Sequence, residues 1–334
     1  MKKYKNDIKN ISISFLNLNL FGKFKVILKI LGIRKFIYNT LYFFLTGITK
    51  SKNYFLKGIF FDTQKYRSEY IITKNKFNEK FILFTNDNII SKEIYVNEEF
   101  DLKKLKKTLK FLNKKKKIEN LYDIGANLGV ICIPAVKRGL VKKAFAVEAE
   151  LHNFELLKTN VVLNNLENKI SIYNYALSNQ DDQEIEMELA EDSSGDHRIK
   201  SQVKFNIHGE ENRKIIKVKT KKFDTLFNKT KQNNDLVWID TQGYEPIILQ
   251  GAKKLIESKA PIVIEFWPYG LKRANLWEEM FEVLKHFNFY VDLSNQELYL
   301  NKINEDSLKK LSEGWEEEKK GMYSLYTDIL LLRE

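Results

Sequence analysis

Cysteine is almost missing from the 334-residue chain, since Cys132 is the only one. A single cysteine excludes an intrachain disulfide framework and a cysteine-rich metal site. Cys132 falls in an apolar stretch behind a glycine turn, so we expect a buried core residue rather than a nucleophile. Scarce cysteine fits a cytoplasmic protein, and a hydrophobic content of 43% is enough for a sizeable core.

The N-terminal region lacks an apolar run that could span a bilayer. Its longest uncharged stretch, residues 36–49, has about 14 residues with polar ones among them, against roughly 20 for a spanning helix. It also lacks a compact apolar segment followed by a small-residue cleavage site, so we expect no cleavable signal peptide.

Acidic residues are scarce in the same region, where Asp7 is the only one in the first 50 residues. Residues 1–120 hold 27 Lys and Arg against 10 Asp and Glu, whereas residues 121–334 hold 29 against 34. Cations between residues 23 and 35 interrupt an apolar background at the spacing of a basic amphipathic helix. We therefore expect residues 1–50 either to pack on the core as a helical cap or to contact an anionic membrane surface peripherally.

Strand-like segments at 70–73, 80–85 and 89–91 precede an amphipathic, lysine-rich helix at 102–112. On the lysine-bearing face of that helix no aromatic residues are interleaved with the lysines, which favours a solvated face over a nucleic-acid surface. These segments predict a small β/α subdomain over residues 61–118.

The stretch Leu121-Tyr-Asp-Ile-Gly-Ala-Asn-Leu-Gly-Val130 reads as a strand running into a nucleotide-binding turn. Gly125 permits the tight turn, and Gly129 lets the next helix pack closely while backbone N–H groups face a ligand. Asp123 lies at the strand end, and Glu148 follows at the spacing of an acid that binds a ribose diol. The turn has one glycine fewer than G-x-G-x-x-G, which favours adenosine without a pyrophosphate, as in S-adenosylmethionine. In the alternative, the glycines only turn the chain and both acids are solvated.

Strand and helix patterns alternate from residue 121 onward, which predicts crossover connections and a parallel sheet covered by helices on both faces. We place this core domain at residues 119–334, after a basic extension at 1–60 and the subdomain described above. An insert at 181–221 contains one acidic and one lysine-rich run, which predict a pair of strands with opposite charges facing each other.

Candidate reactive groups occur in a loop of the insert and at the ends of two later strands. His197 lies in the polar loop 191–199 and is either a general base or part of an exposed turn. Asp240 ends one strand and Glu265 ends the next, where a parallel sheet forms its crevice. Glu245 either faces the acceptor or simply begins a helix, where a carboxylate favours the positive end.

Three motifs taken together resemble the FkbM family of S-adenosylmethionine-dependent methyltransferases. They are the D-x-G-A-N-x-G turn, the segment Ile239-Asp-Thr-Gln-Gly-Tyr-Glu245 that leads to Gly251-Ala252, and the apolar strand that closes in Glu265. The resemblance covers roughly residues 81–332. It implies a Rossmann-like class I methyltransferase, an α/β fold with a seven-stranded, mostly parallel sheet whose last strand is antiparallel.

The same resemblance implies S-adenosyl-L-methionine as cofactor and a hydroxyl of a sugar, glycan or related metabolite as acceptor. The cofactor-binding residues would be Asp123, Gly125, Ala126, Asn127, Gly129 and Glu148, with Ala176 and Leu177 flanking the adenine. Asp240, His197 and Glu245 are the candidate bases, and Glu265 would contact the acceptor.

Three alternatives stay open at this point. A divalent metal held by Asp240 and Glu245 could polarise the hydroxyl, although no histidine and carboxylate cluster with tight ligand spacing occurs, and we expect no metal. The domain could also bind a cofactor or glycan without turnover. Methylation of nucleic acid fits poorly, because the segment after Asp240 lacks the Pro-Pro-Tyr/Phe that holds a flipped base, and Cys132 is misplaced for cytosine chemistry.

Overall fold

The computed structural model describes residues 54–114, 117–201, 213–228, 234–319 and 326–333. The chain divides into two compact units, residues 1–68 and 69–334. In the first unit, helix α3 spans Tyr54–Gln64, and the predictions for residues 1–50 fall outside the described ranges. None of the helices in these ranges combines the length and apolar character needed to cross a membrane.

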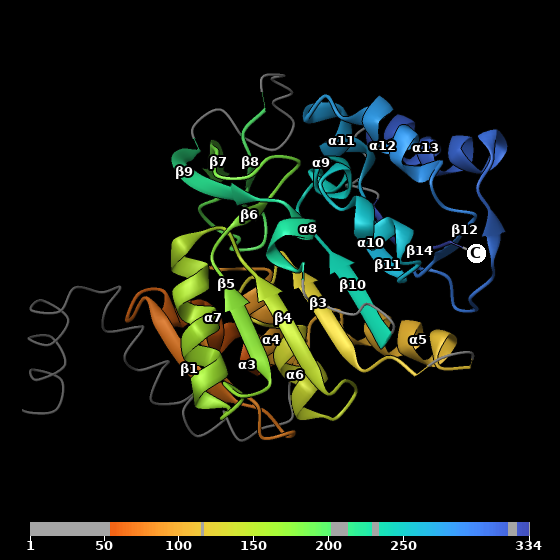
Figure 1. Cartoon of the computed structure of the whole chain (residues 1–334). Coiled ribbons are helices and arrows are strands. Elements are labelled where there is room, and N and C mark those ends of the chain that lie inside the picture. The colour runs from red at the N-terminus through yellow and green to blue at the C-terminus, as the bar shows by residue number, and fades with distance from the viewer. Residues whose placement is uncertain (1–53, 115–116, 202–212, 229–233, 320–325, 334) are drawn as a thin grey trace, which may run out of the picture. The chain divides into compact units, whose positions relative to one another are not determined.

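An eight-stranded sheet forms the centre of the second unit (Figure 1). From one edge to the other, its strands are β13 (Asn301–Lys302), β12 (Phe289–Asp292), β14 (Thr327–Leu332), β11 (Ile262–Phe266), β10 (Asp235–Ile239), β3 (Asn120–Ile124), β4 (Lys143–Val147) and β5 (Ile170–Tyr173). The pairs from β11 to β5 are all parallel, and β14 is antiparallel to both of its neighbours, as expected. The predicted number of seven strands is wrong, because β13 adds an eighth. Two residues are too few to show an alternating pattern.

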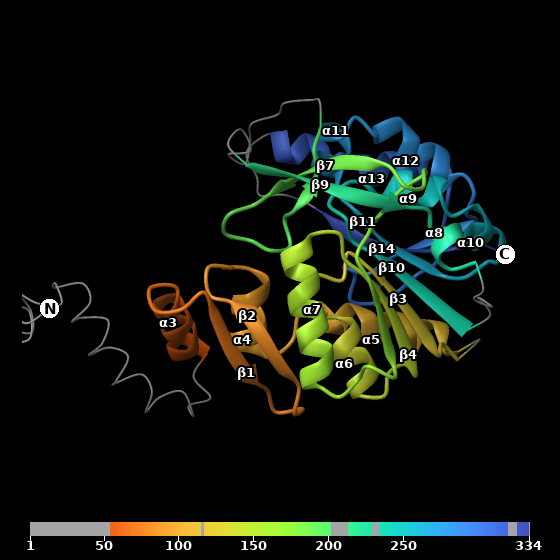
Figure 2. The ribbon, with the colours of Figure 1, turned by 60° about the vertical axis from the view of Figure 1, so that its left-hand side comes forward.

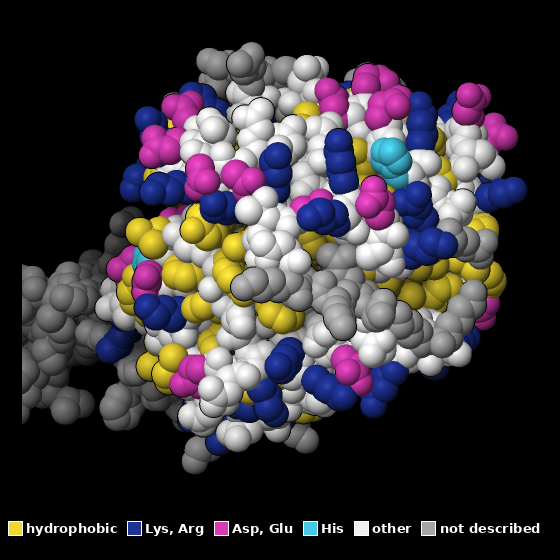
Figure 3. All heavy atoms as spheres, in the orientation of Figure 1, with side chains coloured by type: hydrophobic (Ala, Val, Ile, Leu, Met, Phe, Trp, Pro, Cys, Tyr) yellow, Lys and Arg dark blue, Asp and Glu magenta, His cyan; other side chains and the backbone are white. Residues whose placement is uncertain are grey.

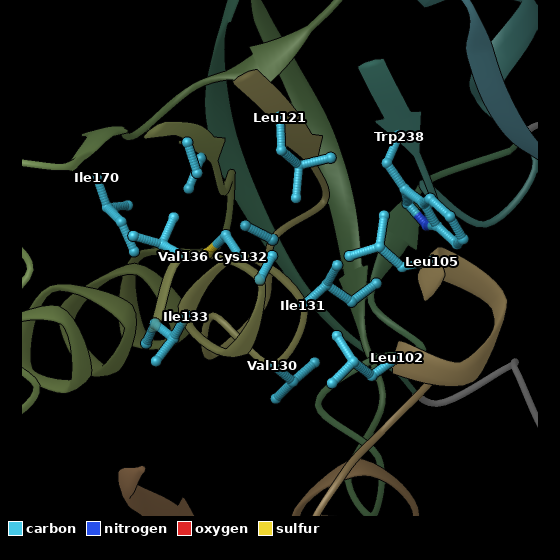
Figure 4. Close-up of a cluster of buried hydrophobic side chains, with 14 of the residues drawn as sticks. Leu102, Leu105, Leu121, Val130, Ile131, Cys132, Ile133, Val136, Ile170 and Trp238 are labelled. Carbon is cyan, nitrogen blue, oxygen red and sulfur yellow. The ribbon is translucent and has the colours of Figure 1, made fainter. Parts of the chain in front are cut away.

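Helices cover both faces of this sheet, because alternate residues of each strand point to opposite sides (Figure 2). Leu121 packs in one core and Tyr122 in the other. The first core contains α5 (Leu102–Leu112), α6 (Cys132–Lys137) and α7 (Leu151–Leu163), with Cys132 fully buried in it (Figure 4). The second core contains α8 (Phe223–Leu226), α9 (Glu245–Gln250), α10 (Lys253–Glu257), α11 (Pro268–Arg273) and α12 (Trp277–Leu284). Helix α13 (Glu305–Lys319), which the sequence pattern did not predict, follows β13.

A hairpin and a short helix precede the main sheet. Strands β1 (Tyr70–Lys74) and β2 (Lys80–Phe84) pair antiparallel. The strand expected at residues 89–91 is absent, because these residues lead into helix α4 (Ile90–Asn97). The Asp87 carboxylate accepts hydrogen bonds from the backbone N–H groups of Ile89, Ile90 and Ser91, which satisfies donors that the first helical turn leaves free.

The insert forms a second, four-stranded sheet in the order β6 (Ala176–Leu177), β9 (Lys214–Lys221), β7 (Glu184–Leu189) and β8 (Arg198–Ile199). Strands β7 and β9 are antiparallel, with Glu184 opposite Lys219 and Glu186 opposite Lys217. Acidic and basic side chains therefore intermix on the surface around β9 (Figure 3). Opposite charges across neighbouring strands favour this register over one that places like charges together.

Candidate functional site

The turn after β3 lies against the turn after β10, at the carboxyl edge of the sheet. Gly125 has φ +84°, and a Cβ atom built on it would lie 1.9 Å from the carbonyl oxygen of Asp240. Its N–H and that of Ala126 both donate to the Val147 carbonyl oxygen, at 2.9 and 3.0 Å. Any side chain at residue 125 would therefore push the two turns apart.

Glu148 is joined to this turn by main-chain hydrogen bonds. Its Oε2 accepts from the N–H of Asn127 at 2.8 Å, and its Oε1 accepts from that of Glu150 at 2.9 Å. Asp123, which is 1% exposed, accepts from the Cys132 N–H at 3.1 Å. Burial raises the pKa of Glu148 to about 7 and that of Asp123 to about 6, and the main-chain donors oppose the rise in both cases.

A cavity opens at this edge of the sheet and encloses about 860 Å³ with its mouth included. Nine of the predicted site residues line it, namely Asp123, Gly125, Ala126, Asn127, Glu148, Ala176, Leu177, His197 and Asp240. Its apolar end, where we expect the adenine, is made by Tyr175, Ala176 and Leu177 together with Met187 and Ile199 of the insert. The cavity thus combines an apolar slot with a carboxylate at its side, as nucleoside sites do.

Three predicted residues lie outside this lining: Glu265, which lines an adjoining cavity, and Gly129 and Glu245, which support the backbone. A Cβ atom on Gly129 would approach Ile133 and Leu157 to within 3 Å, so this glycine serves helix packing. Glu245, which is 1% exposed, accepts from the Thr241 N–H at 2.8 Å and the Thr241 hydroxyl at 3.0 Å. This position fits the reading in which Glu245 begins helix α9 and fixes the turn before it.

Asp240 and Glu265, at the ends of β10 and β11, share one hydrogen-bond donor. The Nε2 amide of Gln242 donates to Asp240 Oδ1 at 2.9 Å and to Glu265 Oε2 at 3.0 Å. Gln242 reaches both carboxyls from a left-handed backbone conformation, with φ 58°. Burial and the surrounding carboxylates, Asp328 among them, raise the pKa of both Asp240 and Glu265 well above the usual range.

A second cavity adjoins the first, and Asp240 and Gln242 line both. It encloses about 1170 Å³ with its mouth included. Besides Asp240 and Gln242, its charged and polar lining includes Asp101, Asp196, Arg198, Arg213, Glu265, Tyr326 and Asp328. Asp240 is therefore at the boundary of two cavities, whereas Glu265 lines the second one alone.

Trp267 also lines the second cavity. The Arg198 guanidinium lies 5.2 Å from its ring centroid and the Tyr269 ring lies at the same distance. The Trp267 side chain is buried among them, and its Nε1 donor has no partner among the described groups. Packing thus occupies the ring, and the N–H group is buried.

The amino-acid sequence of residues 123–291 matches the family model described as the methyltransferase FkbM domain. This match covers half of the chain. The chain belongs to the FkbM methyltransferase family. The matched region includes the glycine turn, strands β10 and β11 with Asp240 and Glu265 at their ends, and the whole insert.

Solved structures similar to this FkbM chain have low sequence identity to it. Methyltransferase FkbM from Methylobacillus flagellatus KT is 14% identical, with a TM-score of 0.37 over 67% of this chain and 47% of that one. StiE O-MT is 12% identical, with a TM-score of 0.36 over 71% and 73%. TYW2 of P. horikoshii in complex with MeSAdo is 12% identical, with a TM-score of 0.32 over 80% and 72%. The chain spans about half the length of the first of these, and no curated protein matches it.

Several residues of the FkbM site were missed by the sequence analysis. Met187, Ser194 and Ile199 reach the first cavity from the insert, and Asn153 reaches it from α7. Ile199 and Met187 face each other across β7 and β8, a pairing that only the folded insert defines. Within the described ranges, no three His, Cys, Asp or Glu side chains are grouped as ligands for a metal ion.

Proposed function

We propose that this FkbM methyltransferase uses S-adenosylmethionine to methylate a hydroxyl of a sugar or glycan. The observation that supports this most is the position of Asp240, which lines the nucleoside cavity and the adjoining polar cavity and shares Gln242 with Glu265. A carboxyl pair between donor and acceptor suits transfer to an oxygen, because a hydroxyl must lose its proton as the new bond forms.

The residues around the first cavity fit S-adenosylmethionine. Gly125 keeps the turn open, the Glu148 carboxylate lies where a ribose diol would bind, and an apolar slot is available for adenine. When bound, the cofactor supplies an electrophilic methyl group on its sulfonium.

The acid–base step falls to the carboxyl pair. Asp240 in its ionised form accepts the proton of the acceptor hydroxyl, and its raised pKa makes it a stronger base than an ordinary aspartate. Gln242 holds Asp240 and Glu265 in fixed positions through one amide, so the hydroxyl oxygen can be held in line with the methyl group. Glu245, bonded to its own turn, takes no part in proton transfer in this scheme.

The polar lining of the second cavity suits an acceptor that carries several hydroxyl groups. Carboxylates accept from hydroxyls, and the buried Trp267 N–H is a donor that has no partner among the described groups. Sugar hydroxyl groups both donate and accept hydrogen bonds, and a sugar carries several of them at close spacing. We therefore place the acceptor among glycans.

The proposal is tested by incubating the protein with methyl-labelled S-adenosylmethionine and a panel of free sugars, glycosides and polysaccharides. Label transferred to an alkali-stable methyl ether, with a mass increase of one methylene, is the expected result. The Asp240→Asn variant should bind S-adenosylhomocysteine and transfer no label. Label found only on amino groups or nucleic acid, or binding of the cofactor with no transfer to any acceptor, would contradict O-methyl transfer to glycans.

A further inference from the structure

The side chain of Asn127, inside the glycine turn after β3, is hydrogen-bonded to the insert. Its Nδ2 donates to the Ser194 carbonyl oxygen at 2.8 Å, while its backbone N–H donates to the Glu148 carboxylate. Asn153, on α7, donates from Nδ2 to the same carbonyl at 3.0 Å. Two amides from separate elements thus hold one carbonyl of the insert at the rim of the nucleoside cavity.

Two further contacts fix the same loop of the insert. The Ser194 hydroxyl donates to Asp87 Oδ2 at 2.6 Å, which ties the loop to the start of α4. A Cβ atom on Gly195 would lie 2.3 Å from Ile90 Cδ1, so the loop backbone packs against the side chain of Ile90 in α4. Residues 194 and 195 are therefore held from three sides, and His197 follows two residues later.

His197 is held in one tautomer by its own contact. Its Nδ1 accepts from the backbone N–H of Ala190 at 3.1 Å, so a neutral imidazole carries its proton on Nε2. Burial lowers the pKa of His197, opposed by the nearby Glu150 and Asp196, which favours the neutral ring. None of the described groups accepts a hydrogen bond from Nε2, and His197 lines the nucleoside cavity.

A complementary acceptor lies in the wall of the same cavity. Asn153 is 1% exposed and lines the cavity, yet its Oδ1 has no hydrogen-bond partner among the described groups. Buried amide oxygens are normally paired. A donor on His197 and an acceptor on Asn153 together suit a hydroxyl group, which accepts one hydrogen bond and donates another.

We propose that His197 donates from Nε2–H to a ribose hydroxyl of the bound cofactor and that Asn153 Oδ1 accepts from that hydroxyl. Asn127 is then a positioning residue, which sets His197 through Ser194. His197 is a cofactor-binding group in this scheme, not the general base. The inference rests on the proposed use of S-adenosylmethionine. It adds the residues that bind a ribose hydroxyl of that cofactor.

The test is calorimetric titration of S-adenosylhomocysteine and its 2′-deoxy and 3′-deoxy analogues. For His197→Phe we expect the affinity for S-adenosylhomocysteine, the ribo compound, to fall about tenfold, which corresponds to the loss of one hydrogen bond. The preference for ribo over at least one deoxy analogue should shrink by a similar factor. His197→Gln, whose amide can donate from the position of Nε2, should recover most of that preference.

Two more variants keep the test independent of folding. Asn127→Asp keeps the size of the side chain but removes the donor to Ser194, so the ribo preference should again shrink. His286→Phe changes an exposed histidine that is absent from the cavity lining and should leave every affinity unchanged. Thermal melts of each variant confirm the folded state.

The outcomes separate the two proposals. If the wild type binds S-adenosylhomocysteine and His197→Phe keeps the full ribo preference, or loses affinity equally for all three compounds, the role of His197 is wrong while the proposed function stands. If the wild type binds none of the three compounds, the cofactor assignment fails and takes this inference with it.

Discussion

The turns after β3 and β10 lie against each other, but they use their carboxylates differently. Behind β3, Asp123 and Glu148 accept hydrogen bonds from backbone N–H groups. Behind β10, Asp240 shares the side chain of Gln242 with Glu265 and faces two cavities. The first arrangement fixes the backbone of its turn, whereas the second holds a carboxyl pair through one side-chain amide, with Asp240 at both cavities.

Substitution of Asp240 should give the largest effect and act on the second turn alone. Removing a general base lowers a transfer rate by about 10²–10⁴-fold, so Asp240→Asn should lose methyl transfer by that factor. The measurement is single-turnover transfer of labelled methyl with an acceptor found in the panel above. Asp306→Asn, at an exposed position of α13, is the control. Transfer at the wild-type rate would remove Asp240 from the chemistry.

Gly125→Ala should break the contact between the two turns. The new methyl group would meet the Asp240 carbonyl at 1.9 Å in a backbone conformation of φ +84°, which we expect to lower the free energy of unfolding by about 2–4 kcal/mol. Gly139→Ala has a similar φ of +69° but nothing within 4 Å, so it should cost only about 1 kcal/mol. Denaturant titration of both variants measures the difference. Equal losses would mean that the close approach at Gly125 contributes nothing.

Glu148→Gln should weaken ligand binding at the turn after β3 and leave the turn after β10 unchanged. Each oxygen of the Glu148 carboxylate accepts from one backbone N–H and keeps a second lone pair for a ribose hydroxyl, whereas glutamine replaces one of these oxygens with a donor NH₂ group. We expect affinity for S-adenosylhomocysteine to fall roughly tenfold, the loss of about one hydrogen bond to the ribose. Unchanged affinity would show that the diol binds elsewhere.

The pH dependence of binding should show the smallest effect. Burial raises the pKa of Glu148 from the ordinary 4.5 to about 7, so the carboxyl is protonated at pH 6 and ionised at pH 8. The ionised form is the better acceptor, hence affinity for S-adenosylhomocysteine should rise across this range by about threefold to tenfold. The rise should be smaller in Glu148→Gln. A flat wild-type profile would contradict the role given to this carboxylate.

Local patterns were enough to predict the central strands, the glycine turn and the nearness of Asp240 to Glu265. Glycine spacing and strand-terminal acids are properties of short segments, and parallel strands bring their carboxyl ends to one edge. The strand expected at 89–91 was wrong because the Asp87 side chain caps a helix there. The eighth strand was missed because β13 has only two residues.

The part of the site that was not predicted depends on contacts between distant segments. Asn127 meets Ser194 across 67 residues, and no pattern around either residue indicates the pair. The role of His197 changes because Ala190 occupies its Nδ1. Gln242 lies in the segment 239–245 that carries the family resemblance, yet its bridge between two carboxyls appears only when β10 and β11 are side by side.

One experiment tests the contrast between the two turns most directly. S-adenosylhomocysteine is titrated into Glu148→Gln and Asp240→Asn side by side with the wild type. We expect binding to Glu148→Gln to be weaker by about tenfold and binding to Asp240→Asn to stay within about threefold of the wild type. If Asp240→Asn loses affinity and Glu148→Gln keeps it, the division into a binding turn and a reacting turn is wrong.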